Sequence, residues 1–323
     1  MNILKLKETM TQEELAEHLG MSRSKVCHAL TKARKEQNVQ YEDKREYTEE
    51  DINKYLEAMR IMQKAYRKLD NKQVQTTIRL NEEKPFGVCY WGDWHDGGMG
   101  TDYEQLDDDT EKIKKTNGLY AMGSGDYKDN YISDSPKGGQ FEQLIQPGMQ
   151  DLSVQKRMEY VAEKLLLLIR GCHDDWDKKS GDKDFVEHLC QLTNSINLWH
   201  GGEVTIKAGN QEYFWRCRHR YKYQSSLNKP NAMRRIMEIQ GPCDVAAEAH
   251  LHDPFIYDGH VMGEYRVLLR SGSYKMFDEY GQKLAGYKGK HGVPLIIMFP
   301  DRKKIIPFRN LDDGIEVLNS LRG

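Results

Sequence analysis

The chain has 323 residues, which is long enough for one large domain and a small accessory module. Hydrophobic residues make up 38% and charged residues 30%, a composition that is too apolar for a disordered protein and typical of a globular one. The formal net charge of −2 excludes a basic surface over the whole molecule, so any nucleic-acid binding must come from a local patch.

The sequence lacks the patterns of a membrane or exported protein. No apolar run approaches the roughly 18 residues that span a bilayer, and residues 1–10 have no apolar stretch followed by a small-residue cleavage site. The six cysteines are scattered without a CxxC pair, which predicts neither a disulfide framework nor a thiolate zinc site. We therefore expect a cytoplasmic protein without a membrane partner.

Residues 11–35 carry a helix-turn-helix pattern. Gly20 can adopt the left-handed conformation that ends a first helix, and Ser22 is a suitable N-cap for a second. Apolar side chains recur at helical spacing on both sides of this break, namely Leu15, Ala16, Leu19, Val26 and Leu30. The pattern resembles the helix-turn-helix modules of transcription regulators and phage proteins.

The second of these helices is a candidate DNA-binding element because it carries five basic residues. In the functional interpretation it enters the major groove and its basic side chains contact phosphates. In the alternative, the module is a small docking domain whose charged face only meets water. The candidate DNA-binding residues are Arg23, Lys25, Lys32, Arg34 and Lys35.

A connecting helix is predicted next. Thr48 is a potential N-cap with the acid Asp51 three residues on, and the helix is expected to reach about Leu69. From about residue 76 the pattern changes to short apolar runs that end in polar loops, which is typical of strands. We therefore expect a helix-turn-helix module over 1–45, a helical connector over 46–75 and a large α/β domain over 76–323.

Three apolar runs in the large domain lead directly into polar loops. Residues 86–91 precede Asp93 and His95, whose spacing lets a carboxylate and an imidazole converge on one cation. Residues 119–122 precede Asp126, which could bridge two metal ions. The alternative interpretation of Asp126 is a simple Gly-Asp turn. Residues 165–169 precede the third loop, which contains Cys172, His173 and Asp174.

Two later runs end in histidines. Residues 203–208 and 211–219 flank Gly209-Asn210, a two-residue sequence that closes a hairpin, and His219 follows the second strand. Residues 244–249 lead into His250 and His252. Since five strand-to-loop junctions each supply residue types that bind metals, chance repetition is a poor explanation, and the sequence predicts a metal site.

These motifs resemble, in order, those of the calcineurin-like metallophosphoesterases: Asp-x-His, Gly-Asp-x-x-(Asp/Asn), Gly-Asn-His-(Asp/Glu), an isolated His and Gly-His-x-His. The resemblance covers about residues 85–310, and residues 270–275 are similar to the same region of phage-borne members. It implies a four-layer α/β/β/α sandwich, in which two mixed sheets are covered by helices. The residue pattern alone predicts only an α/β fold.

The resemblance also implies the roles of individual residues. One metal ion would be held by Asp93, His95 and His252, a second by His219 and His250, and Asp126 would bridge the two. His173 would face the substrate phosphate or the leaving group, with Asp174 orienting its ring. The implied cofactors are two divalent metal ions; manganese is the expected one, with iron, zinc and magnesium as alternatives.

Two residues depart from the family pattern. Cys172 stands where the family has an asparagine ligand, and Ala249 replaces the first glycine of Gly-His-x-His. Cys172 is either an altered ligand, which would favour zinc or iron over magnesium, or a non-ligand whose place is taken by water. His200 competes with His219 for the role of the isolated histidine, and the hairpin strand before His219 favours the latter.

The expected function is hydrolysis of phosphodiester bonds by a water molecule activated between two metal ions, with nucleic acid, and DNA in particular, as the substrate. Such an enzyme would be a nuclease, and a phage-encoded one would work in the host cytoplasm. One alternative is a phosphomonoesterase that acts on a phosphoprotein or a nucleotide. The other is a non-catalytic DNA-binding protein with a degraded metal site. The oligomeric state is left open.

Overall fold

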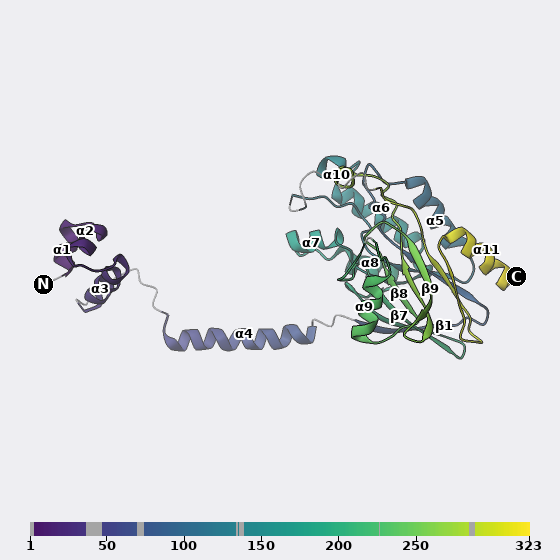
Figure 1. Cartoon of the computed structure of the whole chain (residues 1–323), viewed down its shortest axis with the longest axis horizontal. Helices are drawn as coiled ribbons and strands as arrows, with labels where there is room; N and C mark the ends of the chain where they lie inside the picture. Colours follow the sequence, from purple (N-terminus) through teal and green to yellow (C-terminus); the bar gives the residue numbers. More distant parts are fainter. Residues whose placement is uncertain are drawn as a thin grey trace. The chain divides into compact units, whose positions relative to one another are not determined.

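The computed structural model describes residues 3–36, 47–69, 74–133, 135, 139–225, 227–283 and 288–323. The chain divides into two compact units, Met1–Asn71 and Lys72–Gly323. The helices of both units and some of the strands are labelled in Figure 1. No helix in the described ranges is both long and apolar enough to cross a membrane.

Three short helices form the first part of the small unit: α1 (Ile3–Thr9), α2 (Gln12–His18) and α3 (Arg23–Glu36). Leu15, Val26 and Leu30 are buried between them, as their helical spacing predicts. Gly20 has φ +62°, which confirms the left-handed break between α2 and α3. The Ser22 hydroxyl accepts a hydrogen bond from the Lys25 backbone N–H at 3.4 Å, as an N-cap does.

The fourth helix of the small unit, α4 (Glu49–Leu69), begins where the sequence predicts. The Thr48 hydroxyl accepts from the Asp51 backbone N–H at 3.1 Å, and the Asp51 carboxylate accepts from the Thr48 backbone N–H at 3.1 Å. This reciprocal cap satisfies two backbone donors at the helix start. All described side chains of residues 49–67 are exposed, including apolar ones such as Ile52 and Tyr66.

The large unit contains two mixed six-stranded sheets. The first has the order β1-β6-β7-β8-β10-β9 and the second the order β12-β11-β2-β3-β4-β5. The strands of the first sheet are β1 (Gln75–Leu80), β6 (Gly201–Ala208), β7 (Gln211–Arg218), β8 (Val245–Glu248), β9 (Phe255–Val261) and β10 (Glu264–Arg270). Those of the second are β2 (Phe86–Trp91), β3 (Leu119–Gly123), β4 (Leu165–Leu168), β5 (Ile196–Asn197), β11 (Leu295–Met298) and β12 (Ile305–Phe308).

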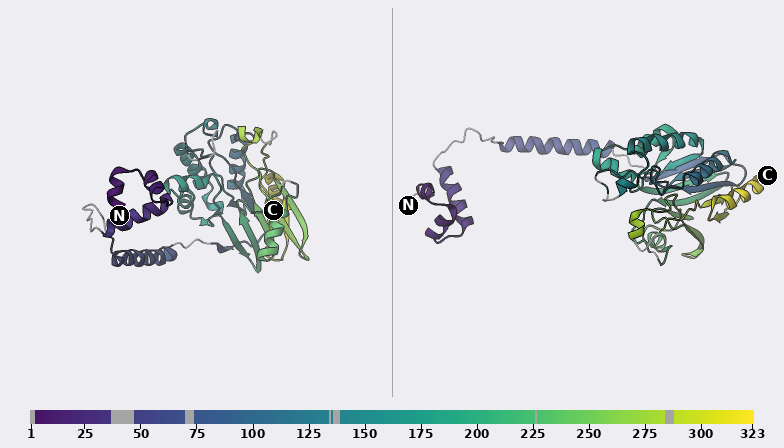
Figure 2. Two further views of the ribbon diagram at one scale, coloured as in Figure 1. Left: turned by 60° about the vertical axis from the view of Figure 1, so that its left-hand side comes forward. Right: turned by 90° about the horizontal axis from the view of Figure 1, so that it is seen from above.

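Helices cover the outer faces of the two sheets (Figure 2). An apolar core that includes Val88 and Tyr90 of β2 and Trp215 of β7 lies between the sheets. A second core joins the other face of the second sheet to α5 (Tyr103–Lys115), α6 (Pro147–Tyr160), α8 (Phe185–Thr193) and α11 (Leu311–Arg322). A third lies between the first sheet and α9 (Asn231–Gln240). The expected four-layer α/β/β/α sandwich is confirmed.

The strand directions bring the polar loops together. β2, β3 and β4 are parallel neighbours in one sheet, and β7 and β8 are parallel neighbours in the other. The predicted hairpin is also present, because β6 and β7 pair antiparallel on either side of Gly209-Asn210. The Tyr90 hydroxyl donates to the Arg218 carbonyl at 2.8 Å and so links the two sheets where β7 ends. Ligands commonly bind at the carboxyl ends of such parallel strands.

Candidate metal centre

The loops that follow β2, β3, β4, β7 and β8 bring the predicted metal-ligand residues together. The nitrogen, oxygen or sulfur donor atoms lie within 4.8 Å of one another inside each of four groups. The first donor group is Asp93, His95 and His252, and the second donor group is Cys172, His219 and His250. Asp126 is a member of both remaining groups. One consists of Asp93, Asp126 and His219, and the other of His95, Asp126 and His173.

The backbone at this centre is strained. Non-glycine residues at positive φ cost roughly 1–3 kcal/mol each and gather at functional sites. Five residues of the centre have this conformation: Asp93 (φ 49°), His95 (49°), Asp126 (51°), His250 (75°) and His252 (50°). The strain shows that the surrounding structure holds these five side chains in place against their local preference.

Asp126 lies at the middle of the centre. Its side chain is buried, one carboxylate oxygen accepts from the His173 backbone N–H at 2.7 Å, and the other lies 3.2 Å from His219 Nε2. Burial by itself would raise the pKa of Asp126, but the charges of His219 and His173 outweigh it and hold the pKa well below its usual range. Asp126 is therefore a buried carboxylate that belongs to two groups of potential metal ligands, one with Asp93 and His219 and one with His95 and His173.

Asp93 offers an unsatisfied oxygen to the same space. Its Oδ2 accepts from the His250 backbone N–H at 3.0 Å. Its Oδ1 is buried, has no hydrogen-bond partner among the described residues and lies 3.5 Å from His252 Nε2. Because an unpaired buried carboxylate oxygen is costly, this atom fits a site that a metal ion completes.

The histidines present ring nitrogens in the way that metal ligands do. His219 Nδ1 donates to the Ser124 carbonyl at 2.8 Å, so Nε2 is the ring nitrogen that faces Asp126, at 3.2 Å. His95 Nδ1 lies 3.2 Å from Asp129 Oδ1, and its Nε2 lies 3.1 Å from His252 Nε2. Two such nitrogens facing each other need a cation or a proton between them.

Asp129 and Lys275 support the centre, and sequence reasoning assigned neither a role. Asp129 Oδ1 accepts from Lys275 Nζ at 2.8 Å as well as facing His95, and both Asp129 and Lys275 are buried. Carboxylates behind metal-binding histidines fix the ring orientation. The sequence signal was available, since Asp129 is the second acid of the Gly-Asp-x-x-Asp motif.

The structure corrects the role expected for Asp174. The ring of His173 pairs through Nδ1 with the Asp129 carbonyl at 2.6 Å, so the Asp129 backbone orients it. Asp174 accepts instead from the backbone N–H groups of Gly171 at 2.8 Å and Asp126 at 2.9 Å. Burial and the charge of Asp126 raise the pKa of Asp174 to about 7. Asp174 thus connects the loop after β4 to the loop after β3. Both loops carry residues of the candidate site.

Two aromatic side chains lie beside His173, and sequence reasoning missed both. The ring centroid of Trp176, on α7 (Asp174–Gly181), is 4.0 Å from that of His173, and the Tyr131 ring is 5.0 Å from Trp176. Burial lowers the pKa of His173 to about 4, so the ring is neutral near neutral pH. With the proton on Nδ1, Nε2 is the ring atom open to proton exchange.

The structure shows where the two residues that depart from the family pattern lie, and which of two histidines belongs to the centre. Ala249 is buried and does not have a positive φ, so a glycine is not required there. His200 is exposed and lies 3.7 Å from Asp175, whereas His219 is the histidine that joins the donor groups. Cys172 Sγ lies 3.7 Å from His250 Nδ1, inside the second donor group.

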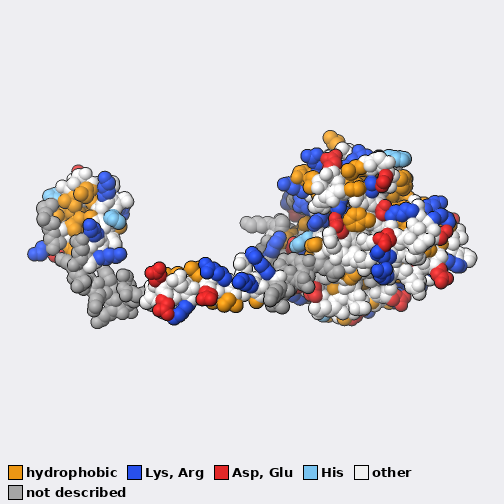
Figure 3. Space-filling view, turned by 90° about the horizontal axis from the view of Figure 1, so that it is seen from below, with side chains coloured by type: hydrophobic (Ala, Val, Ile, Leu, Met, Phe, Trp, Pro, Cys, Tyr) orange, Lys and Arg blue, Asp and Glu red, His pale blue; other side chains and the backbone are white. Residues whose placement is uncertain are grey.

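The candidate DNA-binding residues belong to the small unit and are all exposed on α3. Arg23 pairs with Glu13 of α2 at 2.7 Å, so part of its charge is offset within the unit. Figure 3 shows basic side chains on the surface of the small unit. The exposed residues are Arg23, Lys25, Lys32, Arg34 and Lys35.

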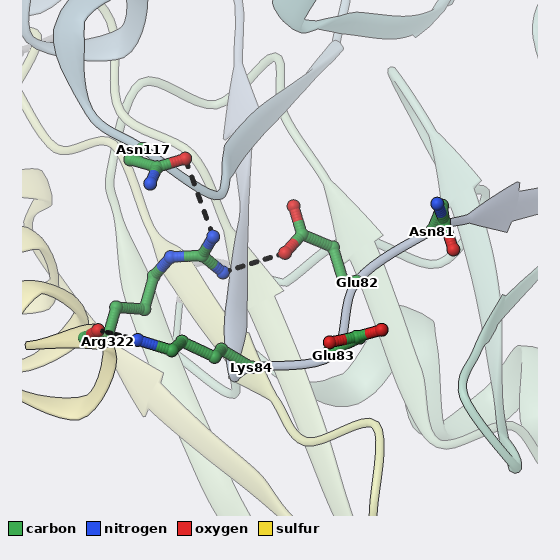
Figure 4. Close-up of a pocket in the computed structure, with 6 residues that line it drawn as sticks. All are labelled: Asn81, Glu82, Glu83, Lys84, Asn117 and Arg322. Carbon is green, nitrogen blue, oxygen red and sulfur yellow. Dashed lines mark hydrogen bonds and ion pairs between the residues drawn. The ribbon is translucent and has the colours of Figure 1, made fainter.

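A surface pocket of the large unit contains none of the predicted site residues (Figure 4). Arg322 of α11 pairs there with Glu82 at 2.8 Å and donates to Asn117 at 3.4 Å. Lys84 donates to the Arg322 carbonyl at 2.6 Å. These contacts attach the last helix to the loops before β2 and β3, and the pocket is a structural feature of that attachment.

No protein-family model matches the chain, and no curated protein matches it. Among solved structures, a predicted phosphoesterase from Streptococcus pneumoniae aligns at 11% identity over 70% of this chain and 98% of its own, with a TM-score of 0.33. Wild-type Vps29 from Entamoeba histolytica, complexed with zinc, aligns at 13% identity over 69% and 98% with a TM-score of 0.38. The calcineurin-like phosphoesterase YfkN from Bacillus subtilis aligns at 10% identity over 75% and 100% with a TM-score of 0.33. Likenesses at these TM-scores carry no inference about function, so the roles of the residues rest on the geometry of the site.

Proposed function

We propose that the chain is a calcineurin-like metallophosphoesterase of the phage-borne type that hydrolyses phosphodiester bonds in nucleic acid. The observation that carries the proposal is Asp126, a buried carboxylate whose two oxygens face opposite members of the centre, the His173 backbone and His219 Nε2. Asp126 belongs to a donor group with Asp93 and His219 and to another with His95 and His173. Two metal ions held about 3.5–4 Å apart can stabilise both the attacking and the leaving oxygen of a phosphate ester.

The donor groups assign the metal positions. Asp93, His95 and His252 would hold one divalent ion, His219 and His250 the other, and Asp126 would contact both; manganese is the expected metal. When bound, two such cations lower the pKa of a water molecule and offset the charge on phosphoryl oxygens. The strained backbone of five of these residues supports the proposal, since strain of this kind persists where function selects for it.

His173 would handle the proton. Its Nδ1 donates to the Asp129 carbonyl, so Nε2 of the neutral ring would accept a proton from the attacking water and then pass it to the leaving oxygen. Its donor atom lies within 4.8 Å of those of His95 and Asp126, so a phosphate between the metal positions would be in reach. Trp176 and Tyr131 beside it offer aromatic faces on which a nucleobase can stack.

The small unit supports nucleic acid as the substrate. In the proposed organisation, residues 1–45 form a helix-turn-helix module that contacts DNA phosphates through the exposed basic side chains of α3. Residues 46–75 connect it to the catalytic domain, residues 76–323. Tethering a DNA-binding module to the active site raises the local concentration of substrate.

The test is hydrolysis of bis-p-nitrophenyl phosphate and p-nitrophenyl phosphate by metal-stripped protein resupplied with manganese, zinc, iron or magnesium. The proposal predicts diester turnover that depends on added metal, followed by cleavage of single- or double-stranded DNA. A preference for the monoester would instead indicate a phosphatase. Inactivity with every metal, together with DNA binding, would indicate a non-catalytic DNA-binding protein.

A further inference from the structure

The sulfur of Cys172 lies close to ring nitrogens of His219 and His250. It follows Gly171 at the end of the loop after β4, and its Sγ lies 3.7 Å from His250 Nδ1. The donor atoms of Cys172, His219 and His250 all lie within 4.8 Å of one another. A sulfur and two nitrogens at such separations are close enough to bind one ion, because Zn–S and Zn–N bonds are about 2.3 Å and 2.0–2.1 Å long.

His219, a neighbour of the Cys172 thiol, is oriented as a metal ligand by contacts that do not involve the cysteine. His219 is buried, its Nδ1 donates to the Ser124 carbonyl, and its Nε2 has no hydrogen-bond partner among the described residues. That Nε2 also lies 3.2 Å from Asp126 Oδ2. Thiolate sulfur, imidazole nitrogen and carboxylate oxygen are all ligand types that zinc binds.

The other cysteines do not share these surroundings. Cys89, Cys190, Cys217 and Cys243 are buried, and burial raises the pKa of each thiol, to about 12 in Cys190 and Cys243. Cys27 is exposed on α3 in the small unit. None of these five belongs to a group of potential metal ligands in the part of the chain that the structure describes.

We propose that Cys172 is a thiolate ligand of the second metal position, together with His219, His250 and Asp126, and that it makes this position selective for zinc-like ions. Binding would replace the thiol proton with a sulfur–metal bond and release that proton to the solvent. The first position, with only carboxylate and imidazole donors, would remain suited to manganese. The inference rests on the proposed metal centre and adds that the two positions differ in metal preference, since thiolates favour zinc over magnesium or manganese.

Cobalt(II) substitution tests the proposal in the full-length protein. Visible ligand-field bands report cobalt bound by any donors, whereas a near-ultraviolet thiolate-to-cobalt band requires a sulfur ligand. We expect both signals in the wild type and in the control Cys27→Ser. In Cys172→Ser the charge-transfer band should disappear while the ligand-field bands persist, and the circular dichroism spectrum should match that of the wild type.

The outcomes separate this inference from the proposed function. Ligand-field bands without a charge-transfer band in the wild type would overturn the thiolate ligand and leave the metal centre intact. A charge-transfer band that survives in Cys172→Ser would also overturn it, because another cysteine would then be the ligand. Failure of the wild type to bind cobalt at all would overturn both the inference and the metal centre.

Metal selectivity provides a second readout that does not depend on turnover. Zinc should protect Cys172 from alkylation by iodoacetamide, measured by peptide mass spectrometry, and magnesium should not. In Cys172→Asn, an amide oxygen replaces the sulfur, so the zinc affinity should fall by at least about tenfold while manganese affinity is kept or rises. Equal zinc affinities in the wild type and Cys172→Asn would contradict the proposal.

Discussion

At the scale of single residues, Asp126 has the largest expected effect because both proposed metal positions depend on it. In Asp126→Asn, the neutral amide removes the charge that the two positions share, so diester turnover should fall by at least about 100-fold and bound metal should decrease. The exposed loop variant Asp301→Asn is the matched control and should behave as the wild type. Turnover close to that of the wild type in Asp126→Asn would show that the carboxylate does not bridge.

His173 lies beside the metal positions, and its variant separates proton transfer from metal binding. In His173→Gln the metal ligands of both positions remain, so metal content should be unchanged. Turnover should fall by about 100- to 10,000-fold, the range in which a positioned acid or base contributes. Parallel measurement of metal content and turnover checks this, and a proportional loss of both would show that His173 acts as a ligand instead.

The pKa of His173 also predicts how the stability of the metal-free protein depends on pH. Burial lowers this pKa from 6.5 to about 4, so folding favours the neutral ring. The contribution of His173 to folding stability is complete above 6.5, the pKa of the ring in the unfolded chain. It is lost as the pH falls towards 4, the pKa in the folded protein. Urea unfolding of metal-free protein at about pH 7 and pH 5 should therefore show a smaller acid-induced loss for His173→Gln than for the wild type. Equal losses would contradict the assigned pKa.

At the scale of elements, the loops after β3 and β4 must approach closely, and Gly171 permits it. A Cβ on Gly171 would lie 2.1 Å from Asp126 Oδ1 and 2.2 Å from its backbone nitrogen, so Gly171→Ala must displace the bridging carboxylate. Turnover should fall by about 100-fold, since displacements near 1 Å can have that effect.

Gly148 provides the control for this substitution. It lies in α6, and a Cβ there would meet nothing within 4 Å, so Gly148→Ala should keep full turnover and gain up to about 1 kcal/mol of stability. Thermal unfolding together with turnover distinguishes the two variants. Equal turnover in both would show that the loop contact is not needed.

Elements were predictable where local sequence determines them. The reciprocal cap of Thr48 and Asp51, the Gly20 break and the Gly209-Asn210 turn each depend on residues close in the chain, and each is present in the structure. The strand ends were also predictable, because an apolar run followed by an acid or a histidine is visible in the sequence. These signals located every junction of the candidate centre.

Contacts between distant loops were not predictable in the same way. Asp129 orients His173 through its backbone carbonyl, and a carbonyl group is carried by every residue, so no residue type identifies it. The role expected for Asp174 was wrong for this reason. The positive φ angles of residues such as Asp93 and His252 are imposed by tertiary packing, against the preference of the residues themselves.

At the scale of the whole molecule, we propose that the large unit carries the chemistry and that α3 contacts DNA. The double variant Arg34→Ala/Lys35→Ala should weaken DNA binding and reduce its salt dependence by about one power of salt concentration per lost phosphate contact. Turnover of bis-p-nitrophenyl phosphate should remain that of the wild type. Lys5→Ala, at an exposed position of α1, is the control, and fluorescence anisotropy across a salt series measures the effect.

Unchanged DNA affinity in the α3 variant would remove the main support for a nucleic-acid substrate. Loss of small-diester turnover in the same variant would show that the small unit contributes to the chemistry itself.

The most direct test of the central claim is anomalous X-ray diffraction from crystals of protein loaded with manganese and zinc. The account predicts two peaks about 3.5–4 Å apart with the Asp126 carboxylate between them. One peak should lie among Asp93, His95 and His252, and the other among Cys172, His219 and His250. A single peak, or two peaks that do not share Asp126, would contradict the two-metal centre.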